Sequence, residues 1–166
     1  MLSVKGRNIY YQCISISHAF STLVAPVLAC DGKVDRFGQS DQASLYSRYR
    51  PQYSSKIIDS IASKVQNWDV YIDWACGSGQ LTHKLAPKFN NTFGVDKSLQ
   101  QLKYLDPNIQ NIVNSDFNLK DSFQDGKVDL ITVAQAIHWL TPHDIFFNEV
   151  NRLLRPDGGA FVIGCY

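Results

Sequence analysis

The sequence contains 166 residues, of which 45% are hydrophobic and 19% charged, and its formal net charge is +1. This length suits one globular domain with a substantial core and is short for two. A net charge near zero gives no field that attracts nucleic acid or an anionic membrane, so we expect a small-molecule partner and neither of those. The four cysteines form no CxxC pair and the four histidines have no metal-ligand spacing, which predicts a cytoplasmic protein without a bound metal.

Residues 1–36 differ in composition from the rest of the chain. Their apolar stretch, residues 14–30, is interrupted by serine, threonine, histidine and proline, and falls short of the roughly 18 uninterrupted apolar residues of a membrane span. We therefore expect a poorly ordered N-terminal extension over residues 1–36. The composition changes near Gly38, and we place one domain over residues 37–166.

Helix and strand patterns alternate along this domain. Ser54 or Ser55 can cap the first helix, and Thr141 is a predicted N-cap with Pro142 at the first position of the last helix. Strands are expected at residues 70–73, 92–95, 111–114, 128–133 and 160–166, and helices at residues 55–65, 81–87, 98–105 and 141–154. The predicted fold class is therefore α/β, with a doubly wound, Rossmann-like, mostly parallel sheet and helices on both faces.

The most informative segment follows the first predicted strand. Asp73 ends that strand, and Gly77 and Gly79 stand one residue apart before a helix. Glycine has no Cβ and accepts positive φ, so such a loop lets the backbone approach a ligand closely, and the start of a helix offers unpaired N–H groups. The segment is a candidate cofactor-binding loop.

Aspartates follow three successive predicted strands: Asp73, Asp96 and Asp116. In doubly wound sheets, ligands bind outside the carboxyl ends of the strands, where the strand order reverses. An ionised carboxylate offers only acceptors, which suits the paired hydroxyls of a ribose, and Asp96 is the best candidate for that role. Structural readings stay open, because Asp96 can cap the helix near Ser98 and Asp116 can begin an Asx turn. Asp129 begins its strand and is expected to face away from the site.

Six segments occur in the order and spacing of one known family: residues 46–51, 72–79, 94–96, 115–117, 135–139 and 153–159. They resemble the motifs of class I S-adenosylmethionine-dependent methyltransferases, in particular the type-11 group that includes trans-aconitate methyltransferases. Residues 72–79 resemble the first motif, D-x-G-x-G-x-G. The resemblance covers about residues 37–166. It implies S-adenosylmethionine as methyl donor and a small-molecule acceptor, with a carboxylate acceptor suggested by analogy to the trans-aconitate enzymes.

The resemblance also implies which residues bind the cofactor. The main chain from Asp73 to Gly79 would hold the methionyl part, Asp96 the ribose, and Asp116 with Phe117 the adenine. Arg50 can pair with the methionyl carboxylate, although a surface arginine is an equal alternative. The full set implied to bind the cofactor is Asp73, Ala75, Cys76, Gly77, Ser78, Gly79, Asp96, Lys97, Asp116, Phe117, Gln135 and Arg50.

His138 and Trp139 follow the fourth predicted strand. His138 can serve as a general base near neutral pH. We expect Trp139, like Trp74, to pack in the core rather than to contact a ligand. Family members that methylate nucleic-acid bases carry Asn or Asp followed by Pro-Pro and an aromatic residue at this place, whereas this chain has Gln135-Ala-Ile-His. This difference favours a small-molecule acceptor.

Two features depart from the family pattern. Ala75 stands where the family commonly has glycine, a change that the turn tolerates if φ is negative there. The sequence ends at Tyr166, so we expect a C-terminally incomplete domain that lacks the family's last two strands. Residues 160–166 would then form an exposed apolar edge.

Two other functions stay open. A nicotinamide-dependent oxidoreductase shares the strand, the glycine loop and the distal acid, but Thr82 stands where G-x-G-x-x-G has its third glycine. A cofactor-binding fragment without catalytic activity would keep the glycine loop and the strand-end acids and lack the part that binds the acceptor.

Overall fold

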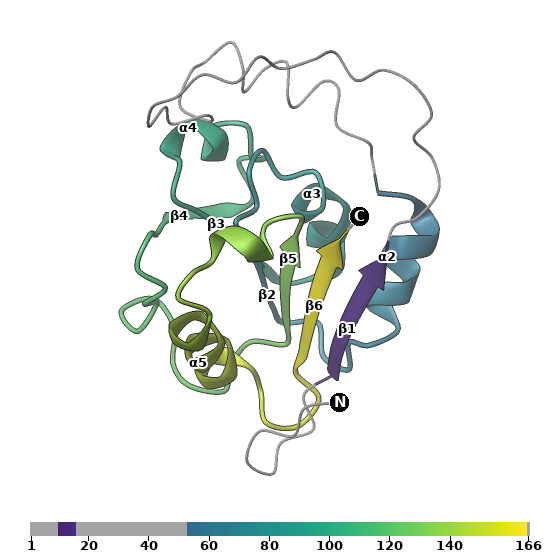
Figure 1. Ribbon diagram of the computed structural model, residues 1–166. Helices are drawn as coiled ribbons and strands as arrows, with labels where there is room; N and C mark the ends of the chain where they lie inside the picture. The colour runs from purple at the N-terminus through teal and green to yellow at the C-terminus, as the bar shows by residue number, and fades with distance from the viewer. Residues whose placement is uncertain (1–9, 16–52, 166) are drawn as a thin grey trace.

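A computed structural model describes residues 10–15 and 53–165. In this part of the chain the strands form one six-stranded sheet in the order β1-β6-β5-β2-β3-β4, and all neighbours are parallel (Figure 1). The strands are β1 (Tyr10–Ser15), β2 (Val70–Trp74), β3 (Asn91–Asp96), β4 (Gln110–Val113), β5 (Leu130–Ala134) and β6 (Ala160–Cys165). The parallel α/β architecture confirms the predicted fold class.

Helices cover both faces of the sheet. On one face, Ile58 of α2 and Leu85 of α3 join Tyr71 of β2 in an apolar cluster. On the other face, Phe146 of α5 joins Ile72 of β2. Because successive residues of a strand point to opposite faces, β2 contributes to both clusters and is buried on both sides. The helices are α2 (Ser55–Ala62), α3 (Thr82–Leu85), α4 (Leu99–Leu102) and α5 (His143–Leu153), with the 3₁₀ turns η1 (Ala86–Lys88) and η2 (Ile137–Trp139).

Strand β2 is the point at which the strand order reverses. The chain runs from β2 outward through β3 to β4 and then returns to β5 on the other side of β2. The connections leaving the carboxyl ends of β2 and β5 therefore diverge, which opens a crevice where doubly wound folds bind ligands. The glycine loop begins at this crevice, directly after Trp74.

The N-terminal extension contains one element of the sheet. Residues 1–36 were expected to be a poorly ordered extension, and within them Tyr10–Ser15 forms β1. The other residues of this extension lie outside the described residues. Tyr10 pairs with Ala160 and Ser15 with Cys165, so β6 is not the exposed edge that the sequence suggested. A parallel partner so distant in sequence leaves no local signal, because the pairing depends on the tertiary fold.

Two helix ends also differ from the prediction. Pro142, rather than Thr141, is the N-cap of α5, because its backbone is extended, with ψ of 133°. Helix α4 ends at Leu102, short of residue 105, where the Leu105 N–H bonds back to the Leu102 carbonyl in a tighter turn. Leu105 nevertheless stays buried against Leu102 and Cys76, as an apolar helix position would.

The opposite, amino end of the sheet holds a buried ion pair. Asp129 is fully buried and accepts hydrogen bonds from the Val70 N–H at 2.9 Å and from Arg155 Nε at 2.6 Å. This placement confirms that Asp129 faces away from the crevice and has a structural role. Across the described residues, every helix falls short of the length and apolar character that crossing a membrane requires.

Candidate functional site

The glycine loop makes a tight turn between β2 and α3. The backbone φ is +55° at Ala75, +56° at Gly77 and +82° at Gly79. The Cys76 N–H donates to the Val95 carbonyl at 3.1 Å, which joins the loop to β3, and the Gly79 N–H donates to the Cys76 carbonyl at 3.0 Å. The condition under which Ala75 would be tolerated without cost, a negative φ, is therefore not met. Left-handed backbone costs a residue with a Cβ roughly 1–2 kcal/mol.

Gly79 is required by close packing as well as by its backbone. A Cβ at this position would lie 2.4 Å from Leu105 Cδ2 and 3.1 Å from the His83 ring. By contrast, the one described atom that a Cβ on Gly77 would meet within 4 Å is Gln101 Oε1, at 3.9 Å. The two glycines thus have different roles: Gly79 allows close packing against Leu105 and His83, whereas Gly77 leaves the surface of the loop open among the described residues.

The carboxylate of Asp73 lies inside the fold rather than in the crevice. Thr82 Oγ1 donates to Asp73 Oδ2 at 2.6 Å, and Thr132 Oγ1 donates to Oδ1 at 2.7 Å. Because Thr132 gives its hydrogen to Asp73, the Tyr71 hydroxyl donates to Thr132 Oγ1, at 2.9 Å. Burial raises the pKa of Asp73 to about 6. Asp73 therefore acts through the loop that it supports, consistent with a main-chain contribution from this segment.

Thr82 has a structural role that the comparison with the dinucleotide motif did not predict. It occupies the place of the third glycine of a dinucleotide motif and instead bonds the buried acid at the end of β2. Thr132 does the same from β5. Sequence reasoning missed both residues, although a hydroxyl at the start of the helix that follows a strand-end acid is a signal that could have identified Thr82.

Asp96 joins β3 to the glycine loop. Its Oδ2 accepts the Gly77 N–H at 2.8 Å, and its Oδ1 accepts the Ser98 N–H at 2.9 Å. The second bond lies just before α4, whose N-cap is Ser98 rather than Asp96, so Asp96 positions the start of this helix without capping it. The first bond brings the acid against the loop across 19 residues of sequence. Lys97, the next residue, is exposed.

The loop after β4 holds the other strand-end acid. Asp116 Oδ1 accepts the Asn118 N–H at 3.1 Å, and this bond is the Asx turn expected as the alternative. The same oxygen also accepts a hydrogen bond from Asn114 Nδ2 at 2.9 Å. Phe117 has φ of +61° and packs edge-on against Phe146, with ring centroids 5.6 Å apart. Asn114, which sequence reasoning missed, also accepts the Phe117 N–H and fixes the turn.

Helix α5 fixes this loop from the other side. Glu149 Oε1 accepts the Leu119 N–H at 2.8 Å and Arg152 Nη2 at 2.6 Å. Arg152 in turn donates to the Phe123 carbonyl at 3.0 Å. The Arg152 guanidinium and the Leu119 N–H hold the pKa of Glu149 below its usual value despite the opposing effect of burial. The three-residue spacing of Glu149 and Arg152 can be read from the sequence, but the backbone groups that they bond, at Leu119 and Phe123, cannot.

The segment after β5 lines the remaining side of the crevice. Gln135 has φ of +60°, and its N–H donates to the Gly164 carbonyl at 2.8 Å. His138 is exposed on η2, with its ring 5.0 Å from that of Trp139. The expectation that Trp139 packs in the core is wrong, because 59% of it is exposed. Trp74 is buried against Phe146, which confirms its predicted packing role.

Backbone strain concentrates at these same three connections. Among the described residues, the non-glycine positions with positive φ are Ala75, Phe117 and Gln135. Each follows a different strand, namely β2, β4 and β5, on the carboxyl side. Strained backbone persists only where the surrounding structure fixes it, and it gathers at binding sites. The sequence alone carries no sign of these angles.

The remaining predicted site residues have simple placements. Cys76 is buried, and burial raises the pKa of its thiol well above the usual value. Ser78 is buried and accepts a hydrogen bond from Gln80 Nε2 at 2.7 Å. Arg50 and the segment around it lie outside the described residues.

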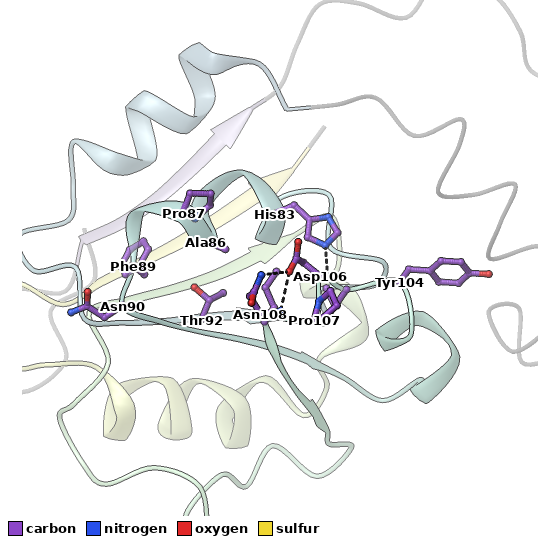
Figure 2. A pocket seen from close by; sticks show the side chains of 12 residues that line it. His83, Ala86, Pro87, Phe89, Asn90, Thr92, Tyr104, Asp106, Pro107 and Asn108 are labelled. Atoms are coloured by element: carbon purple, nitrogen blue, oxygen red, sulfur yellow. Dashed lines mark hydrogen bonds between the residues drawn. The ribbon is translucent and has the colours of Figure 1, made fainter.

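A separate pocket of about 620 Å³ lies behind the glycine loop (Figure 2). It is bounded by α3 and η1 on one side and by residues 104–109 on the other, and His83 Nε2 accepts the Asp106 N–H at 3.0 Å across its rim. His83 also limits the space at Gly79. The pocket contains none of the predicted site residues, so it is distinct from the crevice at the strand ends.

The residues at the crevice fit a nucleoside cofactor. The surface of Gly77 is open, and Asp96 lies against it with acceptor capacity beyond its two backbone bonds. Gln101 Oε1 is buried next to Gly77 without a donor among the described residues. A buried acceptor left without a donor costs about 1–3 kcal/mol, a cost that a bound hydroxyl would remove. In the same part of the chain, no group of three or more side chains could hold a metal ion.

Comparison with known proteins gives one consistent answer. The family model described as "Methyltransferase domain" matches residues 72–162. A Dictyostelium discoideum protein with a methyltransferase name is 35% identical over 133 residues, which cover 77% of this chain and 48% of the relative. The Saccharomyces cerevisiae protein named "Probable S-adenosylmethionine-dependent methyltransferase CRG1" is 26% identical over 136 residues, which cover 76% of this chain and 46% of the relative. The chain thus spans about half the length of the curated relatives it matches.

Solved structures agree with the sequence comparison. An S-adenosylmethionine-dependent methyltransferase from Clostridium acetobutylicum matches with a TM-score of 0.58 and 28% identity, covering 74% of this chain and 55% of that one. The match of the family model extends from β2 to β6 and includes the three strand-end acids Asp73, Asp96 and Asp116. The chain therefore belongs to the class I S-adenosylmethionine-dependent methyltransferases.

Proposed function

We propose that this chain binds S-adenosylmethionine at the carboxyl ends of β2 and β3 and transfers its methyl group to a small molecule. The observation that carries the proposal is the hydrogen bond from the Gly77 N–H to Asp96 Oδ2 at 2.8 Å. It brings an acceptor for ribose hydroxyls against an open glycine loop, at the point where the strand order reverses.

The chain contributes mainly by holding the reactants. When bound, S-adenosylmethionine would supply a methyl group on a sulfonium for in-line transfer, in which the bond from acceptor to methyl carbon forms as the bond to sulfur breaks and S-adenosylhomocysteine leaves. The backbone from Ala75 to Gly79 would bind the methionyl part, Asp96 the ribose, and the loop of Asp116 and Phe117 the adenine. Holding donor and acceptor in line and excluding water are the main sources of rate in such a displacement.

The acceptor that we propose is a small molecule, with a carboxylate as the first class to test. The near-neutral charge gives no support for nucleic acid, and the segment from Gln135 to His138 lacks the motif of base-methylating relatives. The choice of a carboxylate as acceptor rests on the resemblance to the trans-aconitate methyltransferases alone. The cysteine usage supports a cytoplasmic location.

His138 is the proposed general base. It is exposed on η2, at the end of β5 where an acceptor would enter. His138→Gln should lower the methylation rate, as the loss of a general base predicts. An unchanged rate would remove His138 from the mechanism.

A second function follows from the share of the relatives that this chain covers. Because the chain matches 46–48% of the curated relatives, binding of the cofactor without turnover is a specific alternative. Titration calorimetry with S-adenosylhomocysteine tests binding, and transfer of labelled methyl from S-adenosylmethionine to a panel of di- and tricarboxylates tests turnover. Binding with transfer supports the enzyme, binding without transfer to any acceptor supports the alternative, and no binding overturns both.

A further inference from the structure

Gln101 is the least explained buried side chain near the site. It lies in α4, and only 4% of it is exposed. Its Oε1 is fully covered and accepts no hydrogen bond within the part of the chain that the structure describes. A buried amide oxygen loses its water without gaining a donor here, so the described residues alone offer no reason for glutamine at this position.

The orphaned oxygen lies beside the glycine loop. Among the residues that the structure describes, the atom nearest to a Cβ built on Gly77 is Gln101 Oε1, at 3.9 Å, and no other described atom outside the neighbouring residues comes within 4 Å. The N–H of the same glycine donates to Asp96 Oδ2 at 2.8 Å. Gln101 and Asp96 therefore converge on Gly77 from α4 and from the end of β3.

The two side chains are linked through one turn of backbone. Asp96 Oδ1 accepts the Ser98 N–H at 2.9 Å, and the Ser98 carbonyl accepts the Gln101 N–H at 3.1 Å. The position of Gln101 is thus fixed relative to Asp96, while the terminal torsion of its amide is soft and can turn from the loop toward a ligand. The amide offers an acceptor without adding a second negative charge next to Asp96.

We propose that Gln101 is a second ribose-binding residue, whose side-chain oxygen accepts a hydrogen bond from one of the two ribose hydroxyls of S-adenosylmethionine. The inference rests on the proposed function. A ribose carries two hydroxyl donors, and each oxygen of Asp96 already accepts one backbone N–H. A neutral acceptor next to Asp96 lets the site bind both hydroxyls while one carboxylate oxygen keeps its bond to Gly77.

The test compares binding of S-adenosylhomocysteine to the full chain and to Gln101→Met, which keeps the length of the side chain and removes its amide. We expect the dissociation constant to rise about 3- to 10-fold, the range for loss of one neutral hydrogen bond. The melting temperature without ligand should not fall, because the variant removes an unsatisfied acceptor. Gln100→Met, an exposed neighbour whose Oε1 accepts Lys103 Nζ, should bind as the unsubstituted chain does.

Ribose analogues make the test specific. With 2′-deoxy- and 3′-deoxy-S-adenosylhomocysteine, the unsubstituted chain should lose affinity for both, whereas Gln101→Met should lose nothing further with one of them. Equal losses in both proteins, an unchanged affinity of Gln101→Met for the parent ligand, or a variant that fails to fold would each overturn the assignment. Failure of the unsubstituted chain to bind S-adenosylhomocysteine would instead overturn the proposed function and this inference with it.

Discussion

Asp96 and Asp116 follow neighbouring parallel strands and yet have different surroundings. Asp96 accepts a hydrogen bond from the glycine loop, a contact between residues far apart in the sequence. Asp116 accepts hydrogen bonds from Asn114 and Asn118, within its own turn. The comparison teaches that the same residue type at the end of a strand can either join two segments distant in sequence, as Asp96 does, or shape its own turn, as Asp116 does.

The largest expected effect concerns the two acids themselves. Asp96→Ala should weaken binding of S-adenosylhomocysteine about 100-fold or more, because hydrogen bonds to a charged acceptor contribute roughly 1.5–3 kcal/mol each. Asp116→Ala should weaken it less than about 10-fold. Titration calorimetry measures both constants. Equal losses for the two variants would show that the contrast in their bonding has no functional meaning.

The glycine loop offers a matched pair of substitutions. Gly79→Ala should destabilise the chain by about 3 kcal/mol, since positive φ costs roughly 1–2 kcal/mol and the new Cβ would collide with Leu105. Gly77→Ala should cost only the backbone share, about 1–2 kcal/mol. Urea unfolding of the two variants measures the difference. If both cost the same, the loop is not held against Leu105 as described.

Asp73 gives the next effect, through pH. Its pKa is about 6 in the folded chain and 3.8 when unperturbed, so between these values the folded state holds the proton and the unfolded state has lost it. Stability should therefore fall as pH rises from about 4 to about 6, by about 2–3 kcal/mol.

The variant Asp73→Asn isolates this contribution, because it carries no titrating group at that position. The free energy of unfolding, measured by urea titration from pH 4 to pH 7, should fall more steeply in the unsubstituted chain than in Asp73→Asn. Parallel curves for the two proteins would mean that the buried acid does not titrate in this range.

The smallest expected effect is an increase in the free energy of unfolding. Ala75→Gly should stabilise the chain by about 0.5–1 kcal/mol, because relief of the left-handed strain at φ of +55° exceeds the added freedom of glycine in the unfolded state. A rise of a few degrees in melting temperature would follow. Destabilisation would indicate that the Ala75 methyl group contributes more by packing than its backbone strain costs.

Sequence reasoning predicted the fold well because its signals are local. The helix capped near Ser54, the strand ending at Asp96 and the glycine loop each depend on spacing within a few residues. The pairing of β1 with β6 and the exposure of Trp139 were not predicted, since both depend on segments distant in sequence.

The candidate site shows the same limit. The strand-end position of Asp96 could be read from the sequence, but its bond to Gly77 could not. The positive φ of Phe117 and the buried amide of Gln101 were equally invisible, because a sequence states neither a torsion angle nor a missing donor.

The pairing of β1 with β6 has a consequence for how the chain folds. Tyr10 lies beside Ala160, so this pairing closes a loop that contains almost the whole domain. Such long-range contacts are entropically costly and tend to form late. Because β1 precedes β6 in the chain by almost the whole domain, β1 is synthesised earlier and must wait for its partner. An unpaired strand in that interval can pair with other chains, which makes Tyr10–Ser15 a site of aggregation risk at high expression.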